Sequence, residues 1–239
     1  MTDPAIRGVL FDKDGTLFDF AATWRTAVRG FIASVAPDDP ALQQALGAAI
    51  GFDVAEGTFE ANSVIVAGHA ADLAAVWRPL APRLDPRALE AGFNAIALGV
   101  GGPTLTPAAE DLPGLLDGLR AAGLSLGVAT HDSEAAARRH LTEVAALDRF
   151  AFIAGYDSGH GLKPGPGMVL AFAATVAIDP AEIVMVGDSA HDMGAARAAG
   201  ARAVGVLTGP ARREDLAPLA DAVLPSIAHL PDWLDAQRR

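Results

Sequence analysis

The stretch GVLFDKDGTLFDF, residues 8–20, joins a short apolar run directly to two acids that stand two positions apart, Asp12 and Asp14. An apolar run of this length, bounded by turn residues, is typical of a buried β-strand. Both carboxylates would then lie at the carboxyl end of the strand, where negative charge is costly unless a positive group lies beside it. Gly15 follows at once and permits the tight departure of the chain that such a loop needs.

The remainder of the chain sets this stretch within an α/β fold. Helical patterns separate further short apolar runs, and this alternation predicts a doubly wound parallel sheet with helices on both faces. Residues 18–100 differ, because helical patterns follow one another there without a convincing strand. We therefore expect a Rossmann-like core of residues 1–17 and 101–239, with residues 18–100 inserted as an all-helical cap domain. The predicted strands are residues 6–11, 124–130, 150–154, 183–187 and 203–207, and the predicted cap helices are residues 20–36, 40–52, 69–80 and 85–99.

Composition limits the classes of function. With 239 residues, of which 51% are hydrophobic and 20% charged, the chain can bury one sizeable core, with or without a smaller domain. The net charge of −11 argues against nucleic acid and anionic membrane as partners, because both require a basic face. The lack of cysteine excludes disulfides, thiolate catalysis and cysteine-ligated zinc. Neither a signal peptide nor a membrane-spanning stretch is evident, so the sequence predicts a cytoplasmic protein.

Polar residues cluster after the ends of the predicted strands. Ligands bind outside the carboxyl ends of parallel strands, so these residues are expected at one edge of the sheet. They supply carboxylates, a threonine hydroxyl and one of the chain's two lysines, a set that suits phosphate and Mg²⁺. In chain order they are Asp12, Asp14, Thr130, His131, Asp132, Lys163, Asp188, Ser189 and Asp192.

These residue types predict chemistry at phosphorus. Mg²⁺ is commonly held by one or two carboxylates plus phosphate oxygens, a role that suits Asp12 and Asp188. A carboxylate can also attack phosphorus to form an aspartyl phosphate. A second acid beside it, here Asp14, can protonate the leaving alkoxide and then deprotonate water. Lys163 would offset charge on the transferring phosphoryl group. Strand alternation would turn the side chain of Lys13 away from those of both acids, and we interpret it as structural.

Simpler interpretations remain for several of these residues. Asp188 or Ser189 could cap a following helix, a role that is compatible with one in the site. Thr130 could be an ordinary last residue of its strand. His131 is a candidate for substrate binding, although a solvent-facing loop position is the simpler interpretation. Trp24 is better explained by packing than by contact with a substrate.

Taken in order, the motifs resemble those of the haloacid dehalogenase-like hydrolases, and within them the phosphoglycolate phosphatase-like branch. The resemblance rests on DKDGTL at residues 12–17, on Thr130, on Lys163 in GLKPGPG and on VGDSAHDMGAARAAGA at residues 186–201. It covers most of the chain. One departure is His131, which stands where this branch commonly has asparagine.

The resemblance implies roles for the acids. Asp12 would be the nucleophile and Asp14 the general acid and base, while the threonine and lysine of the motifs would contact the phosphate. Mg²⁺ would be held by Asp188 together with Asp12 and the backbone carbonyl of Asp14. Asp192 is similar to the second acidic position of the last motif, near the metal or positioning the lysine.

The resemblance also implies a function, a Mg²⁺-dependent phosphomonoesterase for a small metabolite with 2-phosphoglycolate as the leading candidate. Arg25 and Arg29 lie four positions apart on one face of the first cap helix, and Arg25 could meet the carboxylate of such a substrate. A solvated helix face is the alternative. A sugar-phosphate phosphomutase remains the enzymatic alternative, and a non-catalytic phosphometabolite-binding protein is less favoured because it has no use for Asp14. We expect a monomer or homodimer.

Overall fold

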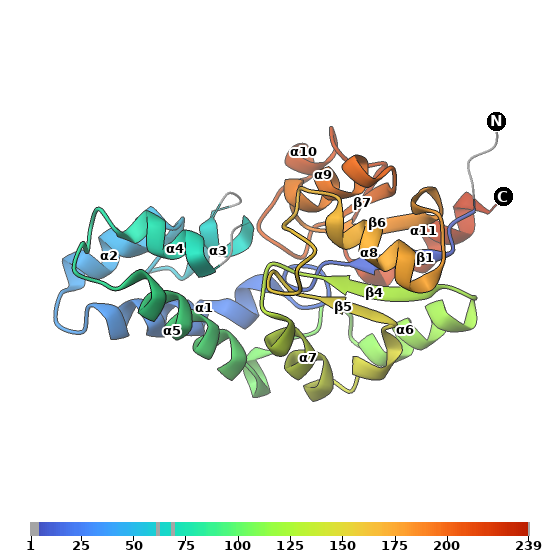
Figure 1. Cartoon of the computed structure of the whole chain (residues 1–239). Helices are drawn as coiled ribbons and strands as arrows, with labels where there is room; N and C mark the ends of the chain where they lie inside the picture. Colours follow the sequence, from blue (N-terminus) through green and yellow to red (C-terminus); the bar gives the residue numbers. More distant parts are fainter. Residues whose placement is uncertain (1–4, 61–62, 68–69, 239) are drawn as a thin grey trace.

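The computed structural model describes residues 5–60, 63–67 and 70–238, and its centre is a parallel six-stranded sheet with the strand order β5-β4-β1-β6-β7-β8 (Figure 1). The register places Phe11, at the end of β1, opposite Val128 of β4 and Val186 of β6. The carboxyl ends of these three strands therefore lie side by side. The strands are β1 (Gly8–Phe11), β4 (Ser125–Ala129), β5 (Phe152–Ala154), β6 (Ile183–Gly187), β7 (Arg202–Val206) and β8 (Ala222–Leu224).

Helices cover both faces of this sheet (Figure 1). Side chains alternate along β1, so Val9 and Phe11 join one buried cluster while Leu10 joins the other. The first cluster also holds apolar residues of α6, α7 and α11, and the second those of α8 and α9. The helices of this part are α6 (Leu112–Ala121), α7 (Glu134–Glu143), α8 (Gly167–Val176), α9 (Ala190–Ala199), α10 (Arg213–Leu216) and α11 (Leu230–Gln237), with short 3₁₀ turns η1 (Gly102–Thr104), η2 (Leu147–Arg149), η3 (Pro180–Glu182) and η4 (Ile227–His229).

A second, mainly helical unit lies between β1 and α6 in the sequence and stands beside the sheet (Figure 1). It contains α1 (Phe20–Val35), α2 (Pro40–Ala49), α3 (Val64–Ala67), α4 (Ala70–Trp77) and α5 (Pro86–Gly99). The side chains of Asp19, Asp39 and Asp85 accept backbone N–H bonds at the starts of α1, α2 and α5, which explains where these helices begin. Position 69, where the third predicted cap helix starts, lies outside the described residues.

Three short strands are absent from the prediction. The helical unit contains an antiparallel pair, β2 (Phe52–Asp53) with β3 (Thr58–Phe59), so the expectation of an all-helical insert is wrong in this detail. The sheet also gains β8 as an edge strand. Strands of two or three residues are too short to show the alternation by which sequence reasoning recognises a strand.

The two connections between the sheet and the helical unit run side by side. Asp19 N–H donates to the carbonyl of Thr106, and Ala108 N–H donates to the carbonyl of Leu17. Phe18 and Pro107 form an antiparallel bridge between them. These contacts fix where the helical unit leaves and rejoins the sheet, next to the end of β1.

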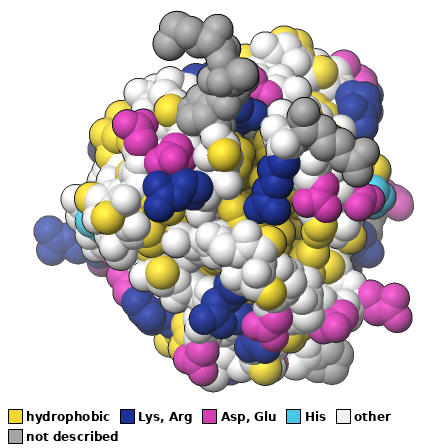
Figure 2. Space-filling model, turned by 90° about the vertical axis from the view of Figure 1, so that its right-hand side faces the viewer, with side chains coloured by type: hydrophobic (Ala, Val, Ile, Leu, Met, Phe, Trp, Pro, Cys, Tyr) yellow, Lys and Arg dark blue, Asp and Glu magenta, His cyan; other side chains and the backbone are white. Residues whose placement is uncertain are grey.

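The surface at the end of the molecule that carries the termini mixes positive and negative side chains (Figure 2). Both signs are interspersed there, and they do not gather into a basic stripe on this face. Within the described residues, none of the helices combines the length and the apolar character that crossing a bilayer requires.

Candidate active site

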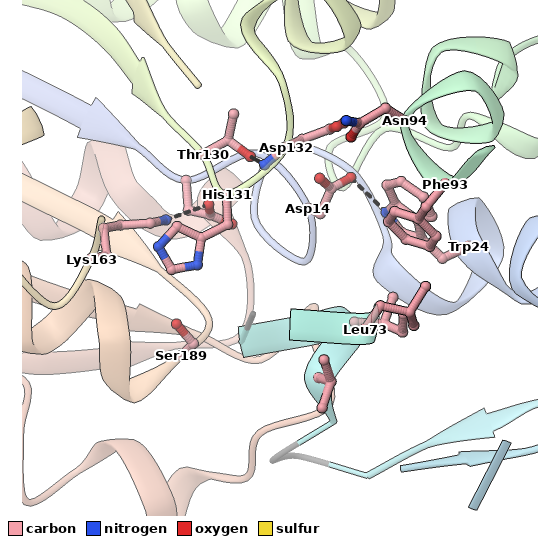
Figure 3. A pocket seen from close by; sticks show the side chains of 13 residues that line it. Asp14, Trp24, Leu73, Phe93, Asn94, Thr130, His131, Asp132, Lys163 and Ser189 are labelled. Atoms are coloured by element: carbon pink, nitrogen blue, oxygen red, sulfur yellow. Dashed lines mark hydrogen bonds and ion pairs between the residues drawn. The ribbon is translucent and has the colours of Figure 1, made fainter. Parts of the chain in front are cut away.

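The polar residues predicted at the strand ends converge at one edge of the sheet. Asp12 follows β1, and its N–H donates to the carbonyl of Val186 at 2.8 Å. Thr130 follows β4, and its N–H donates to the carbonyl of Ala154 at 3.0 Å. A pocket over this edge lies between the sheet and the helical unit (Figure 3). Its lining residues are Asp12, Asp14, Trp24, Val64, Ile65, Leu73, Phe93, Asn94, Thr130, His131, Asp132, Lys163 and Ser189.

Lys163 forms the centre of a buried ion network. Its Nζ lies 2.6 Å from Asp12 Oδ1 and 2.6 Å from Asp192 Oδ1, and it donates to the carbonyl of Ala129 at 2.9 Å. Burial acts to lower the pKa of Lys163, but the negative charges of Asp12 and Asp192 outweigh burial and raise that pKa above its usual value. The lysine therefore stays cationic next to Asp12, as an anion-binding role requires.

The pKa of Asp12 is raised above its usual value. Burial raises the pKa of Asp12 to about 7, with the charge of Asp192 adding to the rise and that of Lys163 opposing it. A raised pKa at a group that has a specific charged partner in a pocket is characteristic of functional sites. A positive charge bound beside Asp12 would oppose this rise and favour the carboxylate form.

The acids can hold a divalent cation. Asp12, Asp188 and Asp192 each place a carboxylate oxygen within 4.8 Å of the others, and all three are buried. Within the described part of the chain, Asp188 Oδ2 has no hydrogen-bond partner. Burial, followed by the charges of Asp12 and Asp192, raises the pKa of Asp188 well above its usual value. A buried oxygen donor without a partner fits Mg²⁺, which prefers hard oxygen ligands.

Two glycines make room for Asp188. A Cβ atom at Gly15, whose φ of +83° already favours glycine, would collide with Asp188 Oδ2, and so would a Cβ atom at Gly209. The nearby Ser189 caps α9, because its hydroxyl accepts from the N–H of Asp192. Asp192 Oδ2 in turn accepts from the N–H and hydroxyl of Ser189. Asp192 is therefore already bound on both oxygens, whereas Asp188 is not.

Asp14 lies on the side of the pocket nearer the helical unit (Figure 3). Trp24 Nε1, from α1, donates to Asp14 Oδ1 at 2.8 Å, and Lys13 Nζ lies 2.6 Å from Asp14 Oδ2. The expectation that Lys13 points away from the acids is therefore wrong with respect to Asp14. Alternation does not apply here because β1 ends at Phe11 and the chain has already turned.

Lys13 is fully buried and has further partners. Its Nζ lies 3.2 Å from Asp132 Oδ2 and 3.0 Å from His140 Nδ1. The other ring nitrogen of His140 lies 2.9 Å from the carbonyl of Ala97 on α5. Burial, followed by the charge of Lys13, lowers the pKa of His140 to about 4, so the imidazole is neutral at pH 7. Through Lys13 and His140, this network connects Asp14 to α7 of the sheet domain and to α5 of the helical unit.

Of the other residues predicted to contact the substrate, some line the pocket and some lie outside it. Thr130 and His131 line the pocket, and Thr130 Oγ1 accepts from the N–H of Asp132 at 3.0 Å. Arg25 does not line the pocket. Its Nε donates to the carbonyl of Gly57 at 2.8 Å, and Arg29 Nε donates to the carbonyl of Val54 at 2.9 Å. Both arginines thus hold the loop between β2 and β3, and the predicted meeting of Arg25 with a substrate carboxylate finds no support.

Sequence reasoning missed part of the site. Trp24 packs against Phe93, as expected of a packing residue, but its hydrogen bond to Asp14 is not predicted, and neither Phe93 nor Asn94 of α5 is singled out by the sequence. The only signal for Trp24 was its place in the first turns of the helix that follows the DKDGTL motif. Nothing in the sequence distinguished Phe93 or Asn94 from other residues of an amphipathic helix.

Comparison with known sequences gives consistent matches. A family model described as haloacid dehalogenase-like hydrolase matches residues 6–200. A phosphoglycolate phosphatase from Rhodospirillum rubrum is 32% identical over 237 residues, which cover 95% of this chain and 90% of that protein. A second phosphoglycolate phosphatase, from Chromobacterium violaceum, is 40% identical over 125 residues, which cover 51% of this chain and 55% of that protein.

Solved structures share the fold. A haloacid dehalogenase-like hydrolase from Bacteroides fragilis matches with a TM-score of 0.72 and 19% identity, covering 94% of this chain and 99% of that one. A β-phosphoglucomutase from Clostridium difficile matches with a TM-score of 0.67 and 18% identity, covering 97% of this chain and 96% of that one. At such identities the likeness concerns the fold alone.

Proposed function

The chain belongs to the haloacid dehalogenase-like hydrolases, and from this membership we propose that it is a Mg²⁺-dependent phosphatase that hydrolyses a small phosphomonoester through an aspartyl phosphate on Asp12. One observation carries the proposal. Asp12, Asp188 and Asp192 converge within 4.8 Å at the strand ends, and Lys163 bonds to two of them. The relatives' names make 2-phosphoglycolate the first natural substrate to assay.

In the first half of the proposed reaction, an Asp12 carboxylate oxygen attacks phosphorus and the bond from phosphorus to the ester oxygen breaks. Protonated Asp14 gives its proton to the departing alkoxide, so the product leaves as a neutral alcohol. Lys163 and the Thr130 hydroxyl donate hydrogen bonds to the phosphoryl oxygens, where preorganised positive charge is most effective.

In the second half, the Asp14 carboxylate takes a proton from water while the water oxygen attacks phosphorus. The acyl phosphate bond breaks, which restores Asp12 and releases inorganic phosphate. Asp12, Asp188 and the backbone carbonyl of Asp14 are the oxygens that we propose hold Mg²⁺, with Asp192 next to them. When bound, Mg²⁺ would supply positive charge to the phosphoryl oxygens.

The test is phosphate release from p-nitrophenyl phosphate, measured with Mg²⁺ and with EDTA. The parent should be active only with Mg²⁺, and Asp12→Asn should lose turnover while keeping the parent's circular dichroism. Asp148→Asn makes the same chemical change at an exposed position and serves as the control. Full activity in EDTA, or in Asp12→Asn, contradicts the proposal. Isomerisation of a hexose 1-phosphate without net phosphate release would instead favour a phosphomutase.

A further inference from the structure

We propose that the alcohol half of the substrate is uncharged and largely apolar, so that the enzyme prefers phosphate esters of hydrophobic alcohols to esters that carry a carboxylate, including the 2-phosphoglycolate that the relatives' names suggest. The inference rests on the proposed phosphatase function and specifies its substrate class. The evidence for this inference is the side of the pocket that the helical unit forms. We call this side the cap wall. It is formed by Trp24, Val64, Ile65, Leu73, Phe93 and Asn94.

The cap wall is apolar over most of its extent. The rings of Trp24 and Phe93 stack with centroids 5.8 Å apart and planes 9° apart, so they form one continuous aromatic surface. In Figure 3, this pair and Leu73 lie beyond Asp14, on the side away from Lys163. The polar atom of Trp24 is already engaged, because its Nε1 donates to Asp14. A leaving group that departs toward Asp14 therefore contacts the apolar side chains of Trp24, Phe93 and Leu73.

The described residues of this wall carry no positive charge. Among the described residues, none of the pocket-lining side chains from the helical unit is an arginine or a lysine. Arg25 and Arg29 are bound to backbone carbonyls of the β2–β3 loop, and Lys13 is buried against Asp14. His131 lies on the opposite wall, near Lys163 and Ser189 in Figure 3. A substrate carboxylate would therefore be desolvated without a partner beside the Asp14 carboxylate, which is unfavourable.

Asn94 is the one polar side chain among the residues of the cap wall. Its Nδ2 donates to the hydroxyl of Tyr156 at 2.8 Å, which holds the amide in place and leaves its oxygen as an acceptor and its second N–H as a donor. This uncharged amide suits a hydroxyl or amide group on the substrate, and it brings no positive charge that would offset a carboxylate. The cap wall thus selects an uncharged alcohol with at most one polar group.

The test compares benzyl phosphate with 4-carboxybenzyl phosphate, which differ by one remote carboxylate. Acetyl phosphate, whose acetate leaving group is small and needs no proton from Asp14, reports on attack by Asp12 with little contribution from the cap wall. We expect kcat/KM to be on the order of 100-fold higher for benzyl phosphate, since a carboxylate buried against the apolar cap wall without a partner costs free energy. Equal or higher kcat/KM for the carboxylated ester, in an enzyme that hydrolyses acetyl phosphate, overturns the inference.

Binding separates this inference from the proposed function. Benzylphosphonate and 4-carboxybenzylphosphonate cannot be hydrolysed, so calorimetry measures the preference of the pocket whether or not turnover occurs. Tighter binding of benzylphosphonate than of its carboxylated analogue, without hydrolysis of any ester, would contradict the proposed function and support the inference about the pocket. Preference for the carboxylated phosphonate, or no preference, overturns the inference.

A positive charge placed on the cap wall should weaken the selection. Ile65→Arg should reduce the benzyl to carboxybenzyl ratio of kcat/KM by about tenfold or more, because it supplies the missing partner. Ala91→Arg adds the same charge to an exposed position of α5 outside the pocket and should leave the ratio as in the parent. An unchanged ratio in Ile65→Arg, with acetyl phosphate turnover retained, contradicts the assignment of the cap wall.

Discussion

Removing the charge of Lys13 should destabilise the protein far more than removing a surface charge with a similar ion-pair distance. Lys13 Nζ is fully buried, 2.6 Å from Asp14 and 3.2 Å from Asp132. Lys13→Met keeps much of the side-chain volume but leaves two mostly buried carboxylates without their cation. Breaking a buried pair in this way costs about 3–5 kcal/mol of the free energy of unfolding.

The chain offers a matched control. Arg138 Nε lies 2.7 Å from Glu134 Oε1, with side chains 50% and 35% exposed, and Arg138→Met should cost only about 0.5 kcal/mol. Urea unfolding followed by circular dichroism at pH 7.5 measures both differences. Adding Asp132→Asn to Lys13→Met should recover about 1 kcal/mol or more, because one uncompensated charge is removed.

The reasoning about Lys13 is refuted if Lys13→Met unfolds within about 1 kcal/mol of the parent, since that would place its loss in the range of surface pairs. It is also refuted if adding Asp132→Asn lowers the free energy of unfolding of Lys13→Met further. In that case the unpaired Asp132 carboxylate would not be the cause of the destabilisation.

Three further predictions concern the site and its support. Asp14→Asn should lower kcat by a factor on the order of 100 to 10,000 for an alkyl phosphate, which needs a proton for its leaving group, and an unchanged kcat would reject the acid–base role. Asp188→Ala should raise the Mg²⁺ concentration for half-maximal activity more than Asp192→Ala, because Asp188 Oδ2 has no partner among the described residues; equal shifts would reverse this ranking. The pKa of His140 is lowered from 6.5 to about 4, so the unfolded chain binds a proton in this window and the folded protein does not. Stability therefore falls as the pH drops, by about 1.6 kcal/mol between pH 6.5 and 5 from this group. Urea unfolding should show a flatter pH dependence in His140→Gln, and the same slope as the parent would contradict the assignment.

The convergence of the site was predictable because it follows from topology. Asp12, Thr130 and Asp188 each follow a strand whose apolar run is evident in the sequence, and parallel strands in register bring their carboxyl ends together. The helical insert was predictable from its periodicity, although its bounds as a domain stay a prediction. These features depend on local patterns and on one general rule of sheet topology.

The details that escaped prediction depend on contacts between distant segments. Arg25 binds the carbonyl of Gly57, a contact that only the folded β2–β3 loop creates. Lys13 meets Asp132 and His140 because β1 ends one residue before Asp12, and a shift of one residue decides where a side chain points. No periodicity in the sequence encodes either contact.

The central claim, a phosphoryl group carried on Asp12, is tested most directly by chemical capture of the intermediate. Asp14→Asn enzyme is mixed with Mg²⁺ and p-nitrophenyl phosphate, whose leaving group needs no proton, so that the intermediate forms but its breakdown by water is slowed. Acid quenching and borohydride reduction convert an aspartyl phosphate into homoserine, which peptide mass spectrometry locates. Homoserine at position 12, present only after exposure to substrate, is the predicted result. Continued release of phosphate with unmodified Asp12 in every quenched sample, or a phosphoryl group on a different residue, would contradict the mechanism.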